Sequence, residues 1–313
     1  MARVPGAIQA RGDAGMGSDK MERSRIWSFA AVAGSVLGFA GAALPALAQD
    51  QGVPVLGAPH EGGIGLQPPA TELAENMDFL HNVVLMPIIT VITLFVLALL
   101  LIIVVKFRES KNPVPSKNTH NTLLEVVWTI VPALVLVFIA VFSFPLLYKQ
   151  LTIPKPGLTI RAIGHQWYWS YEYPDNGNFT FDANLIEKAD LKPGQTYLLD
   201  TDNEVVLPIG TDIRIQITGA DVIHSWTVPS FGVKHDGIPG RTNESWFNIK
   251  QPGIYYGQCS ELCGVRHGYM PIKVHAVTKE EFEAWVKEAQ QKFAKVDGTP
   301  PDSTGTKNVA AAQ

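Results

Sequence analysis

The chain has 313 residues, of which 46% are hydrophobic and 17% charged, and its formal net charge is -4 at pH 7. This composition excludes a wholly disordered protein, and the small negative charge excludes a basic nucleic-acid-binding protein. The apolar residues are concentrated in separate stretches, which indicate a membrane-bound, exported protein.

The first 48 residues have the layout of a secretory signal peptide. A net basic stretch leads into an apolar run over residues 26–44, and the small residues Ala46 and Ala48 form a small-x-small cleavage pattern. We therefore expect a signal peptide over residues 1–48; the alternative is a retained membrane helix. Residues 49–78 are expected to form an N-terminal leader, rich in Gly and Pro up to about residue 70, with residues 71–76 as a candidate helix start.

Two later stretches, residues 83–105 and 123–147, are long and apolar enough to cross a bilayer, which needs about 20 such residues. We expect a transmembrane helical hairpin over residues 79–149, in contact with membrane lipid. The loop between the two stretches carries four cations: Lys106, Arg108, Lys111 and Lys117. Because positively charged loops stay in the cytoplasm, everything after residue 149 is expected outside, which in a bacterial inner membrane means the periplasm.

Glu125 interrupts the apolar pattern at the cytoplasmic end of the second stretch. An acid within a membrane span indicates a functional site, because it must face water, a partner or a proton route. The alternative is a hydrated side chain at the level of the lipid headgroups. Pro132, seven residues further on, is expected to kink the helix unless neighbouring groups compensate for its missing hydrogen bond.

Beyond the hairpin the apolar residues alternate instead of following a helical period. Nine short β-branched or apolar segments are expected to be strands: residues 158–163, 166–173, 196–199, 205–207, 212–218, 222–228, 244–249, 254–258 and 272–277. Many short strands separated by Gly, Pro, Asn and Asp predict a sandwich or barrel of antiparallel strands. We expect this β domain to cover residues 150–277.

The chain ends in a predicted amphipathic helix over residues 278–295. Thr278 and Glu281 have the spacing of a capping box, and apolar residues recur on one face of the segment. Residues 296–313 are expected to form a disordered tail.

The only two cysteines of the chain, Cys259 and Cys263, are followed closely by His267 and Met270. Thiolate and thioether are soft ligands that suit copper, and His224, in an earlier apolar segment, can supply a second imidazole. A disulfide or a zinc site would also use the cysteines. Methionine is a poor zinc ligand and a disulfide needs neither histidine nor methionine, so the full set favours copper.

A run of aromatic residues from 167 to 173 is the second unusual feature. Because strand side chains alternate, Trp167 and Trp169 cannot share a face with Tyr168, so part of the run is turned away from one side of the sheet. An exposed indole near a redox metal would suit contact with a redox partner. Acids in the same domain are candidates for docking a basic partner, the alternative being a generally solvated surface: Glu172, Asp175, Asp202 and Asp221.

From about residue 76 to residue 285 the chain resembles subunit II of bacterial and mitochondrial haem-copper cytochrome c oxidases. The resemblance rests on the hairpin and on five motifs: Glu125-x-x-Trp128, Gly164-His-Gln-Trp-Tyr-Trp169, Asp221-Val-Ile-His224-Ser-Trp226, Ile238-Pro-Gly-Arg241 and Tyr256-Gly-Gln-Cys-Ser-Glu-Leu-Cys-Gly264. It implies two transmembrane helices followed by a cupredoxin-like Greek-key β-barrel that holds a dinuclear copper centre, CuA. The implied partners are oxidase subunit I, with haem and copper, subunit III, and cytochrome c as the electron donor.

The resemblance also implies roles for individual residues. Cys259 and Cys263 would bridge two copper ions. The remaining ligands would be His224, His267, Met270 and the carbonyl of Glu261. The Glu261 carboxylate would reach a magnesium or manganese ion shared with subunit I.

Two further positions correspond to functional residues of the family. Trp167 corresponds to the point where electrons are taken up from cytochrome c, and Glu125 to the mouth of a proton path into subunit I. The chain has no Cys-x-x-Cys-His, so the implied donor is a separate cytochrome c.

Other classes remain as alternatives. A copper chaperone for oxidase assembly also pairs two cysteines with a distant histidine, but it would need neither Met270 nor an acid at the mouth of a membrane hairpin. A nitrous-oxide-reducing enzyme carries a CuA domain together with a histidine-rich second domain, and the 8 histidines of this chain are scattered. A purely structural membrane subunit would leave the metal-ligand pattern unexplained.

Overall fold

The structure is a computed structural model and describes residues 52–293. The signal peptide expected over residues 1–48 and the tail expected over 296–313 lie outside that range. The helical elements of the hairpin are α1 Glu72–Phe79, the π-helical η1 Leu80–Leu85, α2 Met86–Lys106 and α3 Thr122–Leu151.

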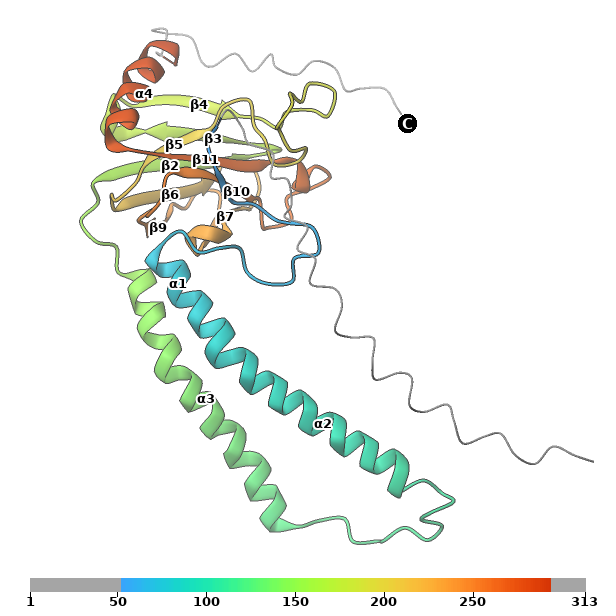
Figure 1. Ribbon diagram of the computed structural model, residues 1–313. Helices are drawn as coiled ribbons and strands as arrows, with labels where there is room; N and C mark the ends of the chain where they lie inside the picture. The colour runs from blue at the N-terminus through green and yellow to red at the C-terminus, as the bar shows by residue number, and fades with distance from the viewer. Residues whose placement is uncertain (1–51, 294–313) are drawn as a thin grey trace, which may run out of the picture. The chain divides into compact units, whose positions relative to one another are not determined.

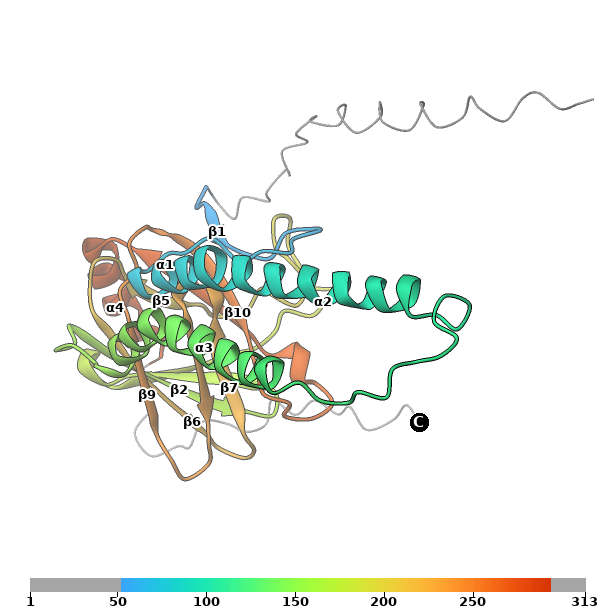
Figure 2. The ribbon, with the colours of Figure 1, turned by 90° about the horizontal axis from the view of Figure 1, so that it is seen from below.

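Both predicted membrane spans are present as helices. The helical stretches Glu72–Lys106 and Thr122–Leu151 are long and apolar enough to cross a membrane. The first begins at Glu72, within the segment expected as leader. Figure 1 shows α1 running on into α2, with α3 as the second arm, and Figure 2 shows residues 107–121 joining the two arms at one end of the hairpin.

The first helix starts where Thr71 caps it. The Thr71 hydroxyl accepts a hydrogen bond from Ala74 N at 3.0 Å and donates one to Phe231 O at 2.8 Å. The threonine thus satisfies a free N–H of the first turn and also ties the helix to the β domain. Glu75 adds an ion pair with Lys250 at 2.6 Å.

The second arm, α3, continues through Pro132 and Pro145 as one helix of 30 residues, about 45 Å long at the usual rise. Asn121 caps its start by accepting a hydrogen bond from Leu124 N at 3.2 Å. Within the described range, no side chain of α2 or α3 is buried. A surface this apolar needs lipid or another chain to cover it.

Within residues 52–293, eleven strands make up most of the β domain. They are β1 Val55–Gly57, β2 Leu158–His165, β3 Tyr168–Tyr173, β4 Phe179–Ala183, β5 Val205–Pro208, β6 Ile213–Gly219, β7 His224–Val228, β8 Val233–Gly237, β9 Asn243–Phe247, β10 Gly253–Gln258 and β11 Pro271–Val277. Among residues 52–293 they hydrogen-bond into three sheets, in the orders β1-β10-β11-β5, β4-β3-β2-β6-β9 and β7-β8. The predicted class, two membrane helices plus an all-β domain, is confirmed, and the stacked sheets are consistent with a cupredoxin-like fold.

Most strand pairs are antiparallel, as expected, but three pairs were not anticipated. The pairs β1–β10, β5–β11 and β2–β6 are parallel. In each of these pairs the two strands are far apart in the sequence, so a long connection allows the parallel direction that a tight hairpin forbids.

The core lies between the sheets and follows the strand period. In β6 the alternate residues Ile213, Ile215 and Ile217 are completely buried, while the residues between them are partly exposed. Burying one such side chain is worth about 1.5–3 kcal/mol.

Helix α4 Lys279–Lys292 covers one end of this core, beside β4 and β5 (Figure 1). The predicted capping box is present: Thr278 and Glu281 satisfy each other's backbone N–H groups. The predicted apolar face is also confirmed, because Phe282, Val286 and Ala289 are buried and Trp285 packs against the core.

Candidate metal centre

The two cysteines lie in a loop whose ends are held side by side. Cys259 directly follows β10 and Met270 directly precedes β11, and these strands are antiparallel neighbours that pair Gln258 with Pro271. We call residues 259–270 the metal loop. His224 comes from a different sheet, as the first residue of β7.

The loop brings all the predicted soft ligands together. The Sγ atoms of Cys259 and Cys263 are 3.9 Å apart. A disulfide has an S–S distance of about 2.05 Å, so the two thiols are free, in agreement with the copper interpretation of the sequence.

Each thiol contacts one imidazole. His224 Nδ1 lies 3.9 Å from Cys259 Sγ, and His267 Nδ1 lies 3.5 Å from Cys263 Sγ. Cys259, Cys263 and His224 form a group of ligand atoms all within 4.8 Å of one another. The arrangement is therefore two thiols in the middle with an imidazole on either side.

Two further donors complete the set. Met270 Sδ is 3.6 Å from Cys263 Sγ, and the carbonyl oxygen of Glu261 is 3.4 Å from Cys259 Sγ. The backbone of Glu261 thus turns toward the thiols while its side chain is exposed. Sulfur and nitrogen donors dominate the site, which fits a soft metal and not magnesium or calcium.

The ligands are shielded from water. The exposed fraction is 6% for Cys259, 4% for Cys263, 1% for Met270 and zero for His224. Only His267 and the Glu261 side chain reach toward solvent. The site therefore opens to the surface through the metal loop itself.

The surroundings shift the pKa values of the two thiols in opposite directions. Burial alone would raise the pKa of Cys259, but hydrogen bonds involving the His224 ring and the Ser225 backbone outweigh it, so the pKa falls below that of a free cysteine. Burial and the neighbouring Cys259 charge raise the pKa of Cys263. Both thiols are deprotonated together most readily when a metal cation lies between them, because the cation offsets their mutual repulsion.

Asp221 orients the buried histidine. Its Oδ1 lies 2.8 Å from His224 Nε2, which leaves His224 Nδ1 facing the thiols. A carboxylate behind a metal-binding histidine fixes the ring and strengthens it as a ligand. Asp221 was expected to be a docking acid, and its contact with His224 was not anticipated.

Close packing holds the same ring from the other side. A Cβ atom on Gly164 would lie 2.6 Å from His224 Cγ, so only glycine fits there. The Trp169 ring, completely buried, meets the His224 ring edge-on with centroids 6.0 Å apart. Neither contact was predicted from the sequence, because glycine and tryptophan are not metal ligands.

Trp167 lies against the metal loop. Its Nε1 donates a hydrogen bond to Cys263 O at 3.2 Å, and the side chain of Gln166 donates to the same oxygen at 2.8 Å. Trp167 is partly exposed, whereas Trp169 is buried, so the two indoles have different surroundings. Gln166 was not singled out from the sequence.

The four candidate docking acids all have partners within the chain. Glu172 pairs with Arg161 at 2.9 Å, Asp175 accepts from Thr159 N at 2.7 Å, and Asp202 accepts from Asn184 N at 2.7 Å. The fourth is Asp221, beside His224. Glu172 lies five residues beyond Trp167 along β3, about 17 Å at the usual rise per residue, whereas Asp221 contacts the ligand candidate His224 directly.

Glu125 is not part of the metal centre. It lies in the first turn of α3, half-buried, in the membrane hairpin. The structure places it at the end of α3 that begins after the basic loop.

The comparisons with known proteins all point to the same family. The family model described as "Cytochrome C oxidase subunit II, periplasmic domain" matches residues 158–277, and the corresponding transmembrane-domain model matches residues 59–146. A probable cytochrome c oxidase subunit 2 of Rickettsia bellii (strain RML369-C) is 48% identical over 223 residues, which cover 71% of this chain and 82% of the relative.

Cytochrome c oxidase subunit 2 of Cereibacter sphaeroides is 43% identical over 277 residues, covering 82% of this chain and 91% of the relative. Among solved structures, the periplasmic domain of subunit II of cytochrome oxidase (CoxB) of Bradyrhizobium japonicum is 54% identical. The match covers 46% of this chain and 100% of that chain, with a TM-score of 0.43.

Proposed function

Because the chain belongs to the cytochrome c oxidase subunit II family, we propose that its metal loop holds a dinuclear copper centre through which electrons from cytochrome c enter the oxidase. The observation that carries this proposal is the donor set: two free thiols 3.9 Å apart, each contacting one imidazole, with a thioether and a carbonyl beside them. When bound, two copper ions sharing both thiolates would accept and release one electron spread over the pair.

The ligand roles follow from which donors adjoin which thiol. Cys259 and Cys263 would both bridge, because they occupy the middle of the site. His224 and the Glu261 carbonyl adjoin Cys259, whereas His267 and Met270 adjoin Cys263.

The rest of the chain keeps this geometry fixed and dry. Asp221 and Gly164 hold His224 in place, and two adjacent strands hold the ends of the metal loop. A site with preset ligands reorganises little when its charge changes, which favours electron transfer. With every donor bound to copper, the site would offer no open position for oxygen. Oxygen reduction, and the proton pumping coupled to it, would therefore take place at the haem and copper of subunit I.

Electrons would be taken up through Trp167, which is partly exposed and hydrogen-bonds to Cys263 O. The exposed Glu261 carboxylate would bind magnesium or manganese at the contact with subunit I, because oxygen ligands suit these hard cations. Subunits I and III would also cover the apolar faces of α2 and α3, alongside lipid. Glu125 would lie at the mouth of the proton path.

The basic loop between α2 and α3 supports an orientation in the bacterial inner membrane with the β domain in the periplasm. The alternative function, a copper chaperone, receives no separate support: Met270 is 1% exposed and within 3.6 Å of a thiol, whereas a chaperone must give its metal away.

Copper content of the full chain in detergent tests the proposal. We expect two copper ions per chain and a mixed-valence paramagnetic spectrum with the electron shared by both ions. Cys263→Ser should abolish this spectrum, because a bridging thiolate is lost. Ser260→Ala should preserve it, because this neighbouring hydroxyl only donates to Gln258 O. A single copper per chain, or colourless zinc binding, would contradict the proposal.

A further inference from the structure

A second buried cluster lies outside the ligand set, where residues 184–204 pass between β4 and β5. We call this segment the strap. Its residue Asp200 is 1% exposed and pairs at 2.8 Å with Lys273, which is 5% exposed. Burying two charges costs free energy unless they are well paired, so a buried ion pair at this position indicates a specific structural role.

The pair spans the two strands that carry the metal loop. Tyr256 lies on β10, three residues before Cys259, and Lys273 lies on β11, three residues after Met270. These two residues face each other in the β10–β11 register. Asp200 Oδ1 binds Lys273 Nζ and also accepts a hydrogen bond from Tyr256 Oη at 3.1 Å.

Other strap residues contact the same region. Leu199 packs with Tyr256 in a small apolar cluster, and Gln258, the residue before Cys259, donates its side-chain amide to Leu198 O at 3.3 Å. Arg266, next to the ligand His267, forms an ion pair with Glu187 of the strap. The strap therefore touches the strand before the loop, the strand after it and the loop itself.

The strap is held in shape by its own hydrogen bonds. Asp202 accepts bonds from both the backbone and side-chain nitrogens of Asn184, which close its base. The second oxygen of Asp200 accepts from Thr196 N at 2.6 Å and fixes the turn at its tip. Asp200 is thus the residue at which the strap's internal structure and its contacts with the metal loop meet.

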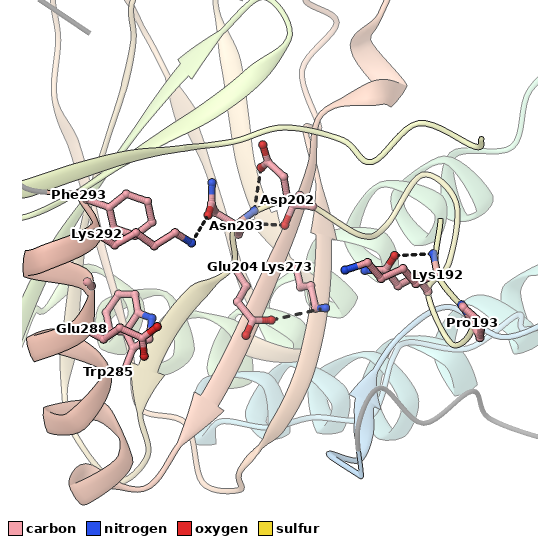
Figure 3. A pocket seen from close by; sticks show the side chains of 13 residues that line it. Lys192, Pro193, Asp202, Asn203, Glu204, Lys273, Trp285, Glu288, Lys292 and Phe293 are labelled. Atoms are coloured by element: carbon pink, nitrogen blue, oxygen red, sulfur yellow. Dashed lines mark hydrogen bonds and ion pairs between the residues drawn. The ribbon is translucent and has the colours of Figure 1, made fainter. Parts of the chain in front are cut away.

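A cavity adjoins this cluster. A cavity of about 360 Å³ opens between the strap and α4, with Glu204 and Lys273 on its wall. Figure 3 shows these two side chains directed toward each other, with Lys192 of the strap on one side and Trp285 of α4 on the other. Glu204 lies 3.5 Å from Lys273 and is partly exposed, so it compensates the buried ammonium less than Asp200 does.

We propose that Asp200 is a positioning residue for the metal loop: through Lys273 and Tyr256 it clamps the strap across both strands that carry the loop. The clamp holds the separation of the Cys259 and Met270 ends before any metal arrives. This inference rests on the proposed function, because the metal loop is taken to be the copper site.

The test compares the full chain in detergent with three variants: Asp200→Asn, Lys273→Met and the double variant. Asp200→Asn removes the nearer of the two carboxylates beside the buried Lys273, and Lys273→Met removes the ammonium beside the buried Asp200, so each single change weakens the clamp and should let the metal loop open more often. In metal-free protein, we expect an aromatic disulfide reagent to modify Cys259 and Cys263 about tenfold faster in Asp200→Asn. In copper-loaded protein, a chelator should remove copper about tenfold to a hundredfold faster. In both rates, the double variant should be closer to the unchanged protein than either single variant is.

Ile215→Ala is the matched control, because Ile215 is completely buried in β6, in the other sheet. It lowers overall stability without touching the clamp, so below its unfolding transition it should leave both rates close to those of the unchanged protein. Equal acceleration by this control would overturn the positioning role. So would unchanged thiol rates in Asp200→Asn, or a double variant no better than the single ones. If the unchanged protein binds no copper, the copper proposal fails, while the thiol rates still decide the role of Asp200.

Discussion

Both carboxylate oxygens of Asp221 form hydrogen bonds beside the metal loop. Oδ1 contacts His224 Nε2 and accepts from Val222 N, and Oδ2 accepts from Gln166 N at 2.7 Å. Burial alone would raise the pKa of Asp221, but the hydrogen bonds from His224, Val222 and Gln166 lower it. A carboxylate held ionised in this way connects the histidine ligand to the segment that carries Trp167.

The chemistry of the ligands was predictable from the sequence, whereas their supports were not. Cysteine, histidine and methionine indicate a soft-metal site by their residue types and spacing. Gly164 and Gln166 act through shape and a single hydrogen bond, which depend on how β2 and β7 meet. The only sequence signal near Gly164 and Gln166 was the aromatic run, and it pointed to the aromatic residues instead of to these two.

Trp167→Phe tests the point of electron uptake. Phenylalanine keeps an aromatic ring but loses the Nε1 donor to Cys263 O, and with it the direct contact between a surface ring and a ligand residue. We expect electron uptake from reduced cytochrome c to slow roughly tenfold or more, because a small misplacement of a reacting group costs that much. Stopped-flow kinetics of the assembled oxidase measures the rate, and the copper spectrum should not change.

Tyr168→Phe is the control for this substitution. Tyr168 is the adjacent residue on β3 and stacks on His165 instead of on the metal loop. Equal rates in Trp167→Phe and in the unchanged protein would remove Trp167 from the electron path.

Among the elements, the strap is where the sequence prediction failed most clearly. Residues 196–199 were expected to be a strand because they are apolar and β-branched, but they form a turn. Leu198 has a positive φ of 69°, and the Asp200 carboxylate holds the turn through Thr196 N. Tertiary contacts with β10 and β11 therefore override the local preference for a strand.

Strands β1, β4 and β8 were not predicted, and for β1 and β8 the reason is related. β1 has only three residues within a Gly- and Pro-rich segment, and it forms by parallel pairing with β10. β8 carries Lys234, His235 and Asp236 in the middle, which conceals its alternation. Short strands of this kind are specified by their partners in the sheet more than by their own sequence.

Helix α4 was predicted well, because its signals are local. Thr278→Ala should remove both hydrogen bonds of the capping box and destabilise the domain by about 0.5–2 kcal/mol. Backbone amides in the first turn of α4 should exchange hydrogen faster, which mass spectrometry of the full chain can follow. Lys287→Ala, on the exposed face of α4, is the control and should change stability little. If the two variants were equally stable, the cap would contribute nothing.

At the scale of the whole molecule, polar contacts join the membrane hairpin to the β domain. Thr71 donates to Phe231 O, Glu75 pairs with Lys250, and Trp246 Nε1 donates to Lys149 O at 3.0 Å. These contacts fix where both membrane helices meet the domain. The two-part organisation was predictable from hydrophobic length alone, whereas the contacts join residues too far apart in the sequence to be read from it.

Glu125→Gln tests whether the hairpin also serves proton transfer. The carboxylate lies in the first turn of α3, where the helix dipole favours a negative charge, and glutamine keeps its size while removing its ability to carry a proton. We expect oxygen consumption by the assembled oxidase to fall roughly tenfold to a hundredfold, because the loss of a positioned proton donor slows a reaction by a factor approaching or exceeding this size. Copper content should stay normal, because Glu125 is not part of the metal centre.

Glu109→Gln is the matched control for this change, since Glu109 is an exposed acid of the loop that joins the same two helices. It removes the same charge on the same side of the membrane, so a general effect of surface charge on turnover would slow both variants alike. A selective loss in Glu125→Gln would instead require a proton to pass through this one position. Normal turnover in Glu125→Gln would mean that the acid is only hydrated at the membrane surface, and the proton path would then have to begin on another subunit.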